Sequence, residues 1–232
     1  MCDAHGVDIA VIGLGLIGGS LLRALAGSGH TLWAFDADPA TRATARTAAA
    51  QAPPNARWQV TGGIRDAVAR ADLTVVAVPF PAVDEVLYEV AAAGYTGLVT
   101  DVTSIKKPVL ELVEHRLRHG HSRLAGFVGG HPMAGRETSG FDAADPDLFT
   151  SCAWVLCLEP DTASADWLLV ADLVTRLGAR VVPTTAEEHD RAVAAVSHVP
   201  HLLAAALASA VADDPLAQTL AAGSFRDGTR VA

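Results

Sequence analysis

The sequence predicts an α/β protein with a doubly wound, mainly parallel sheet followed by an all-helical domain. Short β-rich runs alternate with helical stretches up to about residue 184, and a helical pattern fills the rest of the chain. Several β-rich runs, such as LTVVAV at 73–78, are apolar on both faces. Because half-exposed strands usually alternate apolar and polar residues, such runs predict parallel strands covered on both sides. We therefore expect a first domain at 1–184 and a second at 185–232.

The expected strands are separated by stretches long enough for helices, as a doubly wound sheet requires. They are the runs at 8–13, 31–35, 57–60, 72–78, 97–102, 124–129, 152–159 and 179–184.

The second domain begins with one long helical stretch from Ala186, which carries acidic residues in its first turn. This stretch is apolar nearly all round, so we expect it to be buried against the first domain or another subunit. Pro200 lies inside it and leaves the carbonyl of Val196 without a helical partner, which predicts a kink. A second helix is expected after it, within residues 213–232.

The composition excludes some classes of partner. The formal net charge of −9 disfavours nucleic acid and anionic membranes as main partners. Three cysteines, an odd number without metal-binding spacing, indicate a reducing, cytoplasmic compartment. The first residues lack a basic segment, so we expect no signal peptide. The apolar run at 9–26 divides into a strand and a helix and contains Arg23, which argues against a membrane span.

No metal site is expected. His115, His119 and His121 lie close together, but basic residues surround them. This composition indicates a solvated surface turn rather than a ligand set.

A glycine-rich motif follows the first expected strand. Gly13, Gly15 and Gly18 form GxGxxG at the head of a helix. The first glycine allows a tight turn, the second lets a pyrophosphate approach the backbone, and the third lets helix and strand pack closely. The N-terminus of the helix would then face the phosphates. The motif in this context predicts a dinucleotide site.

Asp36 ends the second expected strand and should accept hydrogen bonds from the adenosine ribose. A 2′-phosphate would be repelled by this carboxylate by roughly a few kcal/mol at close range. No arginine occurs at 37–39, so we predict NAD rather than NADP. The remaining residues predicted to bind the cofactor are Leu16, Ile17, Val78 and Pro79.

The second chemical cluster is the segment GGHPMAGRETSG at 129–140. Too rich in glycine for a strand and too irregular for a helix, it predicts a shaped loop. His131 in this loop and Ser104 are each expected just past a strand end, where ligands bind in such sheets. Further along, His198 and His201 are spaced to share one helical face.

With these motifs the sequence resembles the prephenate/arogenate dehydrogenase family of tyrosine biosynthesis. The resemblance runs nearly end to end and is carried by VIGLGLIGGSL, DVTSIK, GGHPMAGRETSG, EEHDRAVAAVSHVPHLLA and GSFRDGTRVA. It implies a Rossmann domain followed by a helical dimerisation domain, and hence a homodimer. It also implies the NAD-dependent oxidative decarboxylation of prephenate to 4-hydroxyphenylpyruvate.

The resemblance implies roles for individual residues. His131 would accept a hydrogen bond from the 4-hydroxyl of the substrate, and Ser104 would help to orient this histidine and the cofactor. Arg230 would bind a substrate carboxylate. The other residues implied to contact or shape the substrate site are Glu137, His198 and His201. Activity should fall at acidic pH, because a protonated His131 cannot accept the hydroxyl proton.

Each of these residues also has a purely structural interpretation. Ser104 could cap the N-terminus of a helix, and His131 could be a turn residue before a proline. His198 and His201 could be core histidines beside the kink, and Glu137 could be solvated.

Arg136 bears on the choice of substrate. A cation at this position would repel the ammonium group of arogenate and favour the pyruvyl group of prephenate. Arogenate therefore remains an alternative substrate, as does an amino-substituted prephenate of secondary metabolism. Members of the family usually continue through further helices beyond the position of Arg230, and these helices build most of the dimer interface.

Two other functions fit the sequence less well. A β-hydroxyacid dehydrogenase needs a lysine on the helix that joins its domains, but no lysine follows Lys107. A catalytically inert dinucleotide-binding module should have lost its reactive residues, whereas Ser104, His131 and Arg230 are all present.

Overall fold

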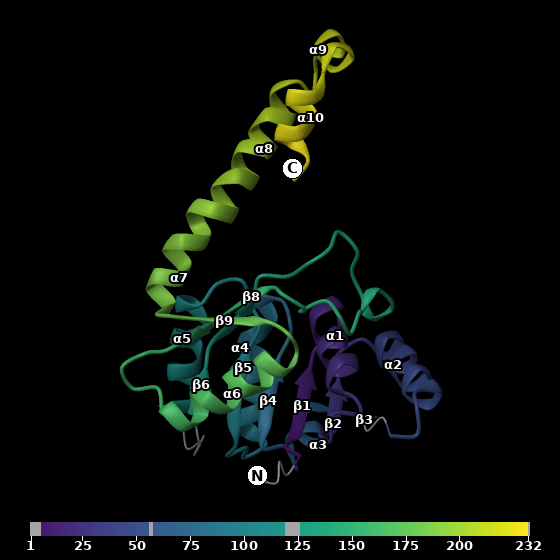
Figure 1. Cartoon of the computed structure of the whole chain (residues 1–232), viewed down its shortest axis with the longest axis vertical. Helices are drawn as coiled ribbons and strands as arrows, with labels where there is room; N and C mark the ends of the chain where they lie inside the picture. The colour runs from purple at the N-terminus through teal and green to yellow at the C-terminus, as the bar shows by residue number, and fades with distance from the viewer. Residues whose placement is uncertain (1–5, 56–57, 119–125, 232) are drawn as a thin grey trace. The chain divides into compact units, whose positions relative to one another are not determined.

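The computed structural model describes residues 6–55, 58–118 and 126–231 (Figure 1). The chain divides into two compact units, Met1–Ala186 and Glu187–Ala232. Among the described residues, the first unit contains all nine strands and the second contains only helices.

The main sheet of the first unit has six parallel strands in the order β3-β2-β1-β4-β5-β6. These strands are β1 (Asp8–Ile12), β2 (Thr31–Phe35), β3 (Trp58–Val60), β4 (Leu73–Val76), β5 (Leu98–Asp101) and β6 (Gly126–Val128). The predicted parallel α/β fold is confirmed. The strand order reverses between β1 and β4, and in sheets of this kind ligands bind at that point, at the carboxyl ends of the strands.

Helices cover both faces of this sheet, and successive strand residues enter two different cores. In β1, Ile9 and Val11 belong to one core cluster, whereas Ala10 and Ile12 belong to the other. This division explains why the strands are apolar on both faces. The helices on the first face are α1 (Leu16–Leu25), α2 (Pro39–Gln51) and α6 (Ser164–Arg176). Those on the second are α3 (Ile64–Val68), α4 (Phe80–Ala92) and α5 (Lys107–Val113), which continues into the π-helical η1 (Glu114–Arg118).

A second, three-stranded sheet differs from the expectation. It contains β7 (Gly130–Pro132), β8 (Ala153–Cys157) and β9 (Arg180–Thr184), with β7 antiparallel and β9 parallel to β8. The prediction of a loop throughout 129–140 is therefore wrong for β7. Pairing with β8 supplies hydrogen-bond partners that overcome the low strand propensity of glycine. His131 thus lies within a second strand, three residues beyond the end of β6 at Val128.

The segment after β7 returns to the first face of the main sheet. It is irregular up to the short 3₁₀ helix η2 (Phe141–Ala143), which packs against α1. A Cβ atom on Gly19 would lie 3.0 Å from the Phe141 ring, so this glycine allows the close approach. The guanidinium of Arg23 lies 4.8 Å from the centre of the same ring.

The long helical stretch of the second unit has three parts. They are α7 (Ala186–Val193), the π-helical η3 (Ala194–His198) and α8 (Val199–Ala210). The disturbance expected from Pro200 therefore takes the form of a π turn immediately before it. Prolines and π turns are two of the usual places at which a helix departs from regular α geometry. Two short helices follow, α9 (Pro215–Leu220) and α10 (Gly223–Thr229), and α10 packs on α8.

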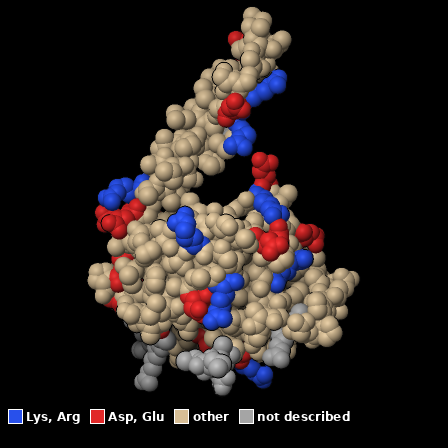
Figure 2. Space-filling model, in the orientation of Figure 1, with Lys and Arg blue, Asp and Glu red and all other residues tan. Residues whose placement is uncertain are grey.

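The surface of α8 is apolar and mostly exposed. Leu202, Leu203 and Leu207 are 70%, 60% and 46% exposed. Figure 2 shows an extended area without charged side chains over α8. By length and composition alone, Ala186–Ala210 also qualifies as a possible membrane span, since an 18-residue window within it has a mean hydropathy of 1.5. The burial expected for this helix is not achieved within its own unit.

Candidate active site

The glycine loop joins β1 to α1 with a geometry that two of its glycines make possible. Gly13 has a φ of +97°, and a Cβ atom there would lie 2.5 Å from the carbonyl oxygen of Ala77. A Cβ atom on Gly18 would lie 1.9 Å from the carbonyl oxygen of Gly13. Both positions therefore require glycine for close packing of the backbone.

Gly15 is glycine for a different reason. A Cβ atom there would meet no protein atom within 4 Å. Gly15 caps α1 without a side-chain hydrogen bond, and the half-buried Leu16 and Ile17 begin the helix. The space beside the first turn is thus available to an anion, which the backbone N–H groups and the helix dipole would stabilise.

Asp36 already faces the glycine loop. Its carboxylate accepts hydrogen bonds from the backbone N–H groups of Leu14 (2.7 Å) and Asp38 (2.8 Å). Each oxygen can accept a further bond, so a ribose diol could be bound without moving the side chain.

Arg42 is a neighbour that the sequence analysis missed, because only residues 37–39 were considered. It lies in the first turn of α2 and donates to the carbonyl oxygens of Asp36 (2.6 Å) and Ala37 (3.0 Å). Its guanidinium also lies 5.4 Å from the centre of the Phe35 ring. The guanidinium of Arg42 is therefore bound to the backbone of the β2–α2 connection.

Val78 and Pro79 complete this edge of the sheet. Both follow β4, and Pro79 caps the N-terminus of α4. A Cβ atom on Gly13 would lie 2.9 Å from Cγ1 of Val78, so the β4 connection lies directly against the glycine loop. The residues predicted to bind the cofactor therefore meet where the strand order reverses.

Ser104 is an exposed residue of the β5–α5 connection, most of which is buried. The N-cap of α5 is Lys106, so the interpretation of Ser104 as a helix cap is wrong.

A buried ion pair in the same connection was also missed. Asp101 ends β5, and both it and Lys106 are 1% exposed. Nζ of Lys106 donates to the Asp101 carboxylate and to Oγ1 of Thr103. The N–H and hydroxyl of Thr103 donate to the same carboxylate. The signal was available, since Lys106 is one of two lysines in the chain and follows an apolar strand.

His131 is half-buried in β7 and pairs with Val155 of β8. Its position in a ladder overturns the interpretation as a turn residue. Gly130 beside it contacts both members of the buried ion pair, through its N–H to Asp101 and its carbonyl oxygen to Lys106. His131 is thus attached to the loop that carries Ser104.

Beyond β7 the chain is exposed, and Glu137 is exposed with it. Arg136 forms an ion pair with Asp145, with the two side chains 50% and 28% exposed. Hydrogen bonding from the Asp147 N–H, and then the contact with Arg136, lowers the pKa of Asp145. The positive charge of Arg136 is therefore balanced within the loop, which weakens the expected repulsion of an ammonium group.

The second unit carries the remaining predicted residues. His198 ends η3, His201 lies in α8 and Arg230 caps the C-terminus of α10. All three are exposed, so the interpretation of the two histidines as core residues is wrong. Nδ1 of His201 lies 2.8 Å from the carbonyl oxygen of Ser197. Because a carbonyl only accepts, Nδ1 carries the proton, and Nε2 of the neutral ring is an acceptor.

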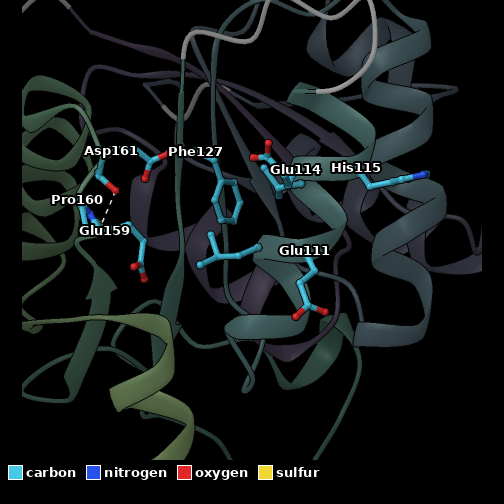
Figure 3. A pocket seen from close by; sticks show the side chains of 10 residues that line it. Glu111, Glu114, His115, Phe127, Glu159, Pro160 and Asp161 are labelled. Atoms are coloured by element: carbon cyan, nitrogen blue, oxygen red, sulfur yellow. Dashed lines mark hydrogen bonds between the residues drawn. The ribbon is translucent and has the colours of Figure 1, made fainter.

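A pocket of about 650 Å³ lies elsewhere in the first unit, between α5–η1 and the connection after β8 (Figure 3). Phe127 lies between its two walls, and Glu111, Glu114, Glu159 and Asp161 line them. Carboxylates repel an anionic substrate, so the pocket is unsuited to a dicarboxylic acid such as prephenate.

Among the described residues, no group of three or more His, Cys, Asp and Glu side chains is arranged to bind a metal ion. His115 is exposed beside the acidic pocket. His119 and His121 lie outside the described residues.

Comparisons with known proteins agree with this arrangement. Residues 21–183 match the family described as prephenate dehydrogenase, nucleotide-binding domain, and residues 185–232 match the prephenate dehydrogenase dimerization domain. The first match begins after the glycine loop, whose assignment rests on its own geometry.

Individual relatives point the same way. The cyclohexadienyl dehydrogenase of Zymomonas mobilis is 34% identical, over 97% of this chain and 75% of that protein. The prephenate dehydrogenase of Bacillus subtilis is 32% identical, over 97% of this chain and 60% of that protein. The crystal structure of Synechocystis arogenate dehydrogenase is 29% identical, with a TM-score of 0.80, over 97% of this chain and 78% of that chain. The chain therefore belongs to the prephenate dehydrogenase family of oxidoreductases.

Proposed function

We propose that this protein is an NAD-dependent prephenate dehydrogenase of tyrosine biosynthesis. In this proposal the first unit binds NAD, and the second contributes to substrate binding and dimerisation. The observation that carries the proposal is that the glycine loop and His131 both follow carboxyl ends of strands in the main sheet. His131 lies three residues beyond the end of β6 at Val128. A dinucleotide and a base would thus share one edge of the sheet.

The residues around the glycine loop fit NAD. The open space at Gly15 suits a pyrophosphate, and the Asp36 carboxylate suits an unphosphorylated ribose. A 2′-phosphate would be repelled by the same carboxylate. When bound, the nicotinamide ring accepts the hydride that leaves C4 of the substrate.

His131 acts as the base in this proposal. Its neutral imidazole accepts the proton of the 4-hydroxyl as the hydride leaves, so the oxygen forms a carbonyl. The ring carboxylate departs as carbon dioxide, and the electrons of the broken bond complete an aromatic ring. The proton then returns to the phenolate oxygen. A positioned base contributes about two to four decades of rate.

Other side chains hold the substrate and the base. Ser104 helps to orient His131, and Arg230 binds a carboxylate. Nε2 of His201 can accept a hydrogen bond from the substrate, because Nδ1 donates to the carbonyl oxygen of Ser197. His198 and Glu137 complete the proposed set.

The biological unit in this proposal is a cytoplasmic homodimer. The exposed leucines of α8 are the apolar surface that a second copy would cover, and the match to a dimerization domain includes them. Burial of such a surface is the main favourable term in association.

The test is NADH formation by the purified protein with prephenate and NAD, repeated with NADP. We expect turnover with NAD and a strong preference over NADP. The variant His131→Asn tests the proposed base. It should retain NAD binding and lose about two to four decades of kcat. Activity of the native protein should also fall at acidic pH, where the imidazole is protonated. Equal turnover by His131→Asn would contradict the role as base.

Arogenate is the second candidate substrate. Arg136 is balanced by Asp145, so its charge does not stand against the ammonium group of arogenate. The similarity to the Synechocystis arogenate dehydrogenase also favours arogenate as a substrate. Steady-state rates with both substrates, in the native protein and in Arg136→Thr, separate the two. If Arg136 selects for prephenate, the substitution will raise the relative rate with arogenate.

A further inference from the structure

The buried pair of Asp101 and Lys106 attaches to the strand that carries His131. Nζ of Lys106 donates to the carbonyl oxygen of Gly130 at 2.6 Å, and the N–H of Gly130 donates to Oδ1 of Asp101 at 3.1 Å. The N–H and the carbonyl oxygen of Gly130 are therefore each bound by a charged side chain, one at the end of β5 and the other just before α5.

These contacts replace a missing strand. Gly129 and Met133 exchange hydrogen bonds with β8, through the N–H of Cys157 to Gly129 (2.7 Å) and the N–H of Met133 to Ala153 (2.8 Å). Residues alternate in direction along a strand, so the polar groups of Gly130 point to the other side of β7. Buried backbone groups need partners, and here the ion pair supplies them.

The fit around Gly130 is close. A Cβ atom there would lie 2.6 Å from the carbonyl oxygen of Asp101 and 3.2 Å from Nε1 of Trp154. The backbone before His131 can therefore shift little without breaking contacts on either side.

A buried ion pair is weak evidence for stability, since apolar residues of similar volume often stabilise a protein equally well. The geometry points to another role. We infer that Asp101 and Lys106 are positioning residues that fix the peptide before His131 and thereby the direction of its imidazole. This inference rests on the proposed role of His131 as base. Neither side chain touches the substrate in this scheme.

The first test compares Lys106→Met with Lys107→Met, a matched control at the exposed neighbouring lysine. We expect Lys106→Met to lower kcat about 10- to 100-fold, with little change in the KM for NAD, because small misplacements of a reacting group have effects of this size. Lys107→Met should keep the native kcat. A native kcat in folded Lys106→Met would overturn the inference.

Two further variants distinguish an effect on the position of His131 from an effect on the stability of the protein. In Asp101→Asn/Lys106→Met no buried charge is left unpaired, so the Tm should recover relative to Lys106→Met while kcat stays low. If kcat recovered with the Tm, the pair would be merely structural and the inference would fail. Thr103→Val loosens the pair without removing a charge and should lower kcat by a smaller factor. If the other variants do not fold, Thr103→Val becomes the test of the inference. A native kcat in Thr103→Val would then contradict the inference.

A double-mutant cycle tests whether the pair acts through His131. In a His131→Asn background, Lys106→Met should have no further effect on kcat, since residues that act as a unit are not additive. Additive losses would overturn the inference. If the native protein does not oxidise prephenate or arogenate, the proposed function fails by itself. The inference is then judged by the NMR resonances of the His131 ring, which Lys106→Met should shift and Lys107→Met should not.

Discussion

The hydroxyl of Ser20 accepts a hydrogen bond of 2.9 Å from the backbone N–H of Asp145. Ser20 is fully buried in α1, the helix that starts at the glycine loop. Asp145 follows η2 and is the partner of Arg136 in the ion pair. One hydrogen bond therefore joins the helix of the expected cofactor site to the segment that continues from the His131 strand.

Replacement of Ser20 tests this connection. Ser20→Ala leaves the N–H of Asp145 without its acceptor, and we expect the free energy of unfolding to fall by about 1–3 kcal/mol. Ser28→Ala is the control, because Ser28 is an exposed residue three positions after α1 and its hydroxyl donates to the carbonyl oxygen of Leu25 nearby in the chain. Urea denaturation of both variants measures the difference, and equal losses would contradict it.

Two glycines of the same loop should respond differently to alanine. Gly18→Ala brings a Cβ atom to 1.9 Å from a backbone oxygen and should lower the Tm markedly. Gly15→Ala meets no protein atom within 4 Å, so the Tm should change little. Its methyl group would instead occupy the space expected for the pyrophosphate and abolish the rise in Tm on adding NAD. A normal NAD response in Gly15→Ala would exclude this position as the phosphate site.

Asp36 should determine the choice between the two dinucleotides. Asp36→Ala removes the carboxylate that binds ribose and repels a 2′-phosphate, so the NAD to NADP ratio of kcat/KM should fall at least tenfold, or about 1.4 kcal/mol. Asp38→Ala is the control. It removes the N-cap of α2, which costs about 0.5–2 kcal/mol of stability, but should leave the ratio unchanged. A changed ratio in the control alone would transfer the role to Asp38.

Tyr95 gives the stability a dependence on alkaline pH. Burial raises the pKa of this phenol to about 12, and its hydroxyl donates to the carbonyl oxygen of Leu98. The unfolded chain loses the phenol proton near the usual pKa of about 10. The folded state therefore binds this proton more tightly. Its contribution to stability is complete below pH 10 and is lost as the pH rises towards 12.

Absorbance of the tyrosinate measures this pKa directly. The chain has two tyrosines, and Tyr88→Phe removes the exposed one. In that variant the remaining phenol should titrate near 12 until the protein unfolds. A titration near 10 in the folded protein would show that Tyr95 is not buried as described.

The sequence by itself determined the main sheet, because apolar runs that fill two cores leave few alternatives to parallel strands between helices. It also located the glycine loop and Asp36, since their chemistry depends on neighbours in the chain. Strand β7 could not be found in this way. Its glycines have low strand propensity, and only pairing with β8, more than twenty residues further along, gives them partners.

The tertiary structure alone decided which distant residues meet. The contacts of Lys106 with Gly130 and of Ser20 with Asp145 join segments far apart in the chain. No local pattern identifies these partners, because the sequence around a lysine or a serine does not show which distant backbone group the side chain will contact. Folding brings each to a backbone group that would otherwise lack a partner, and the need to satisfy buried polar groups then fixes the neighbourhood of His131.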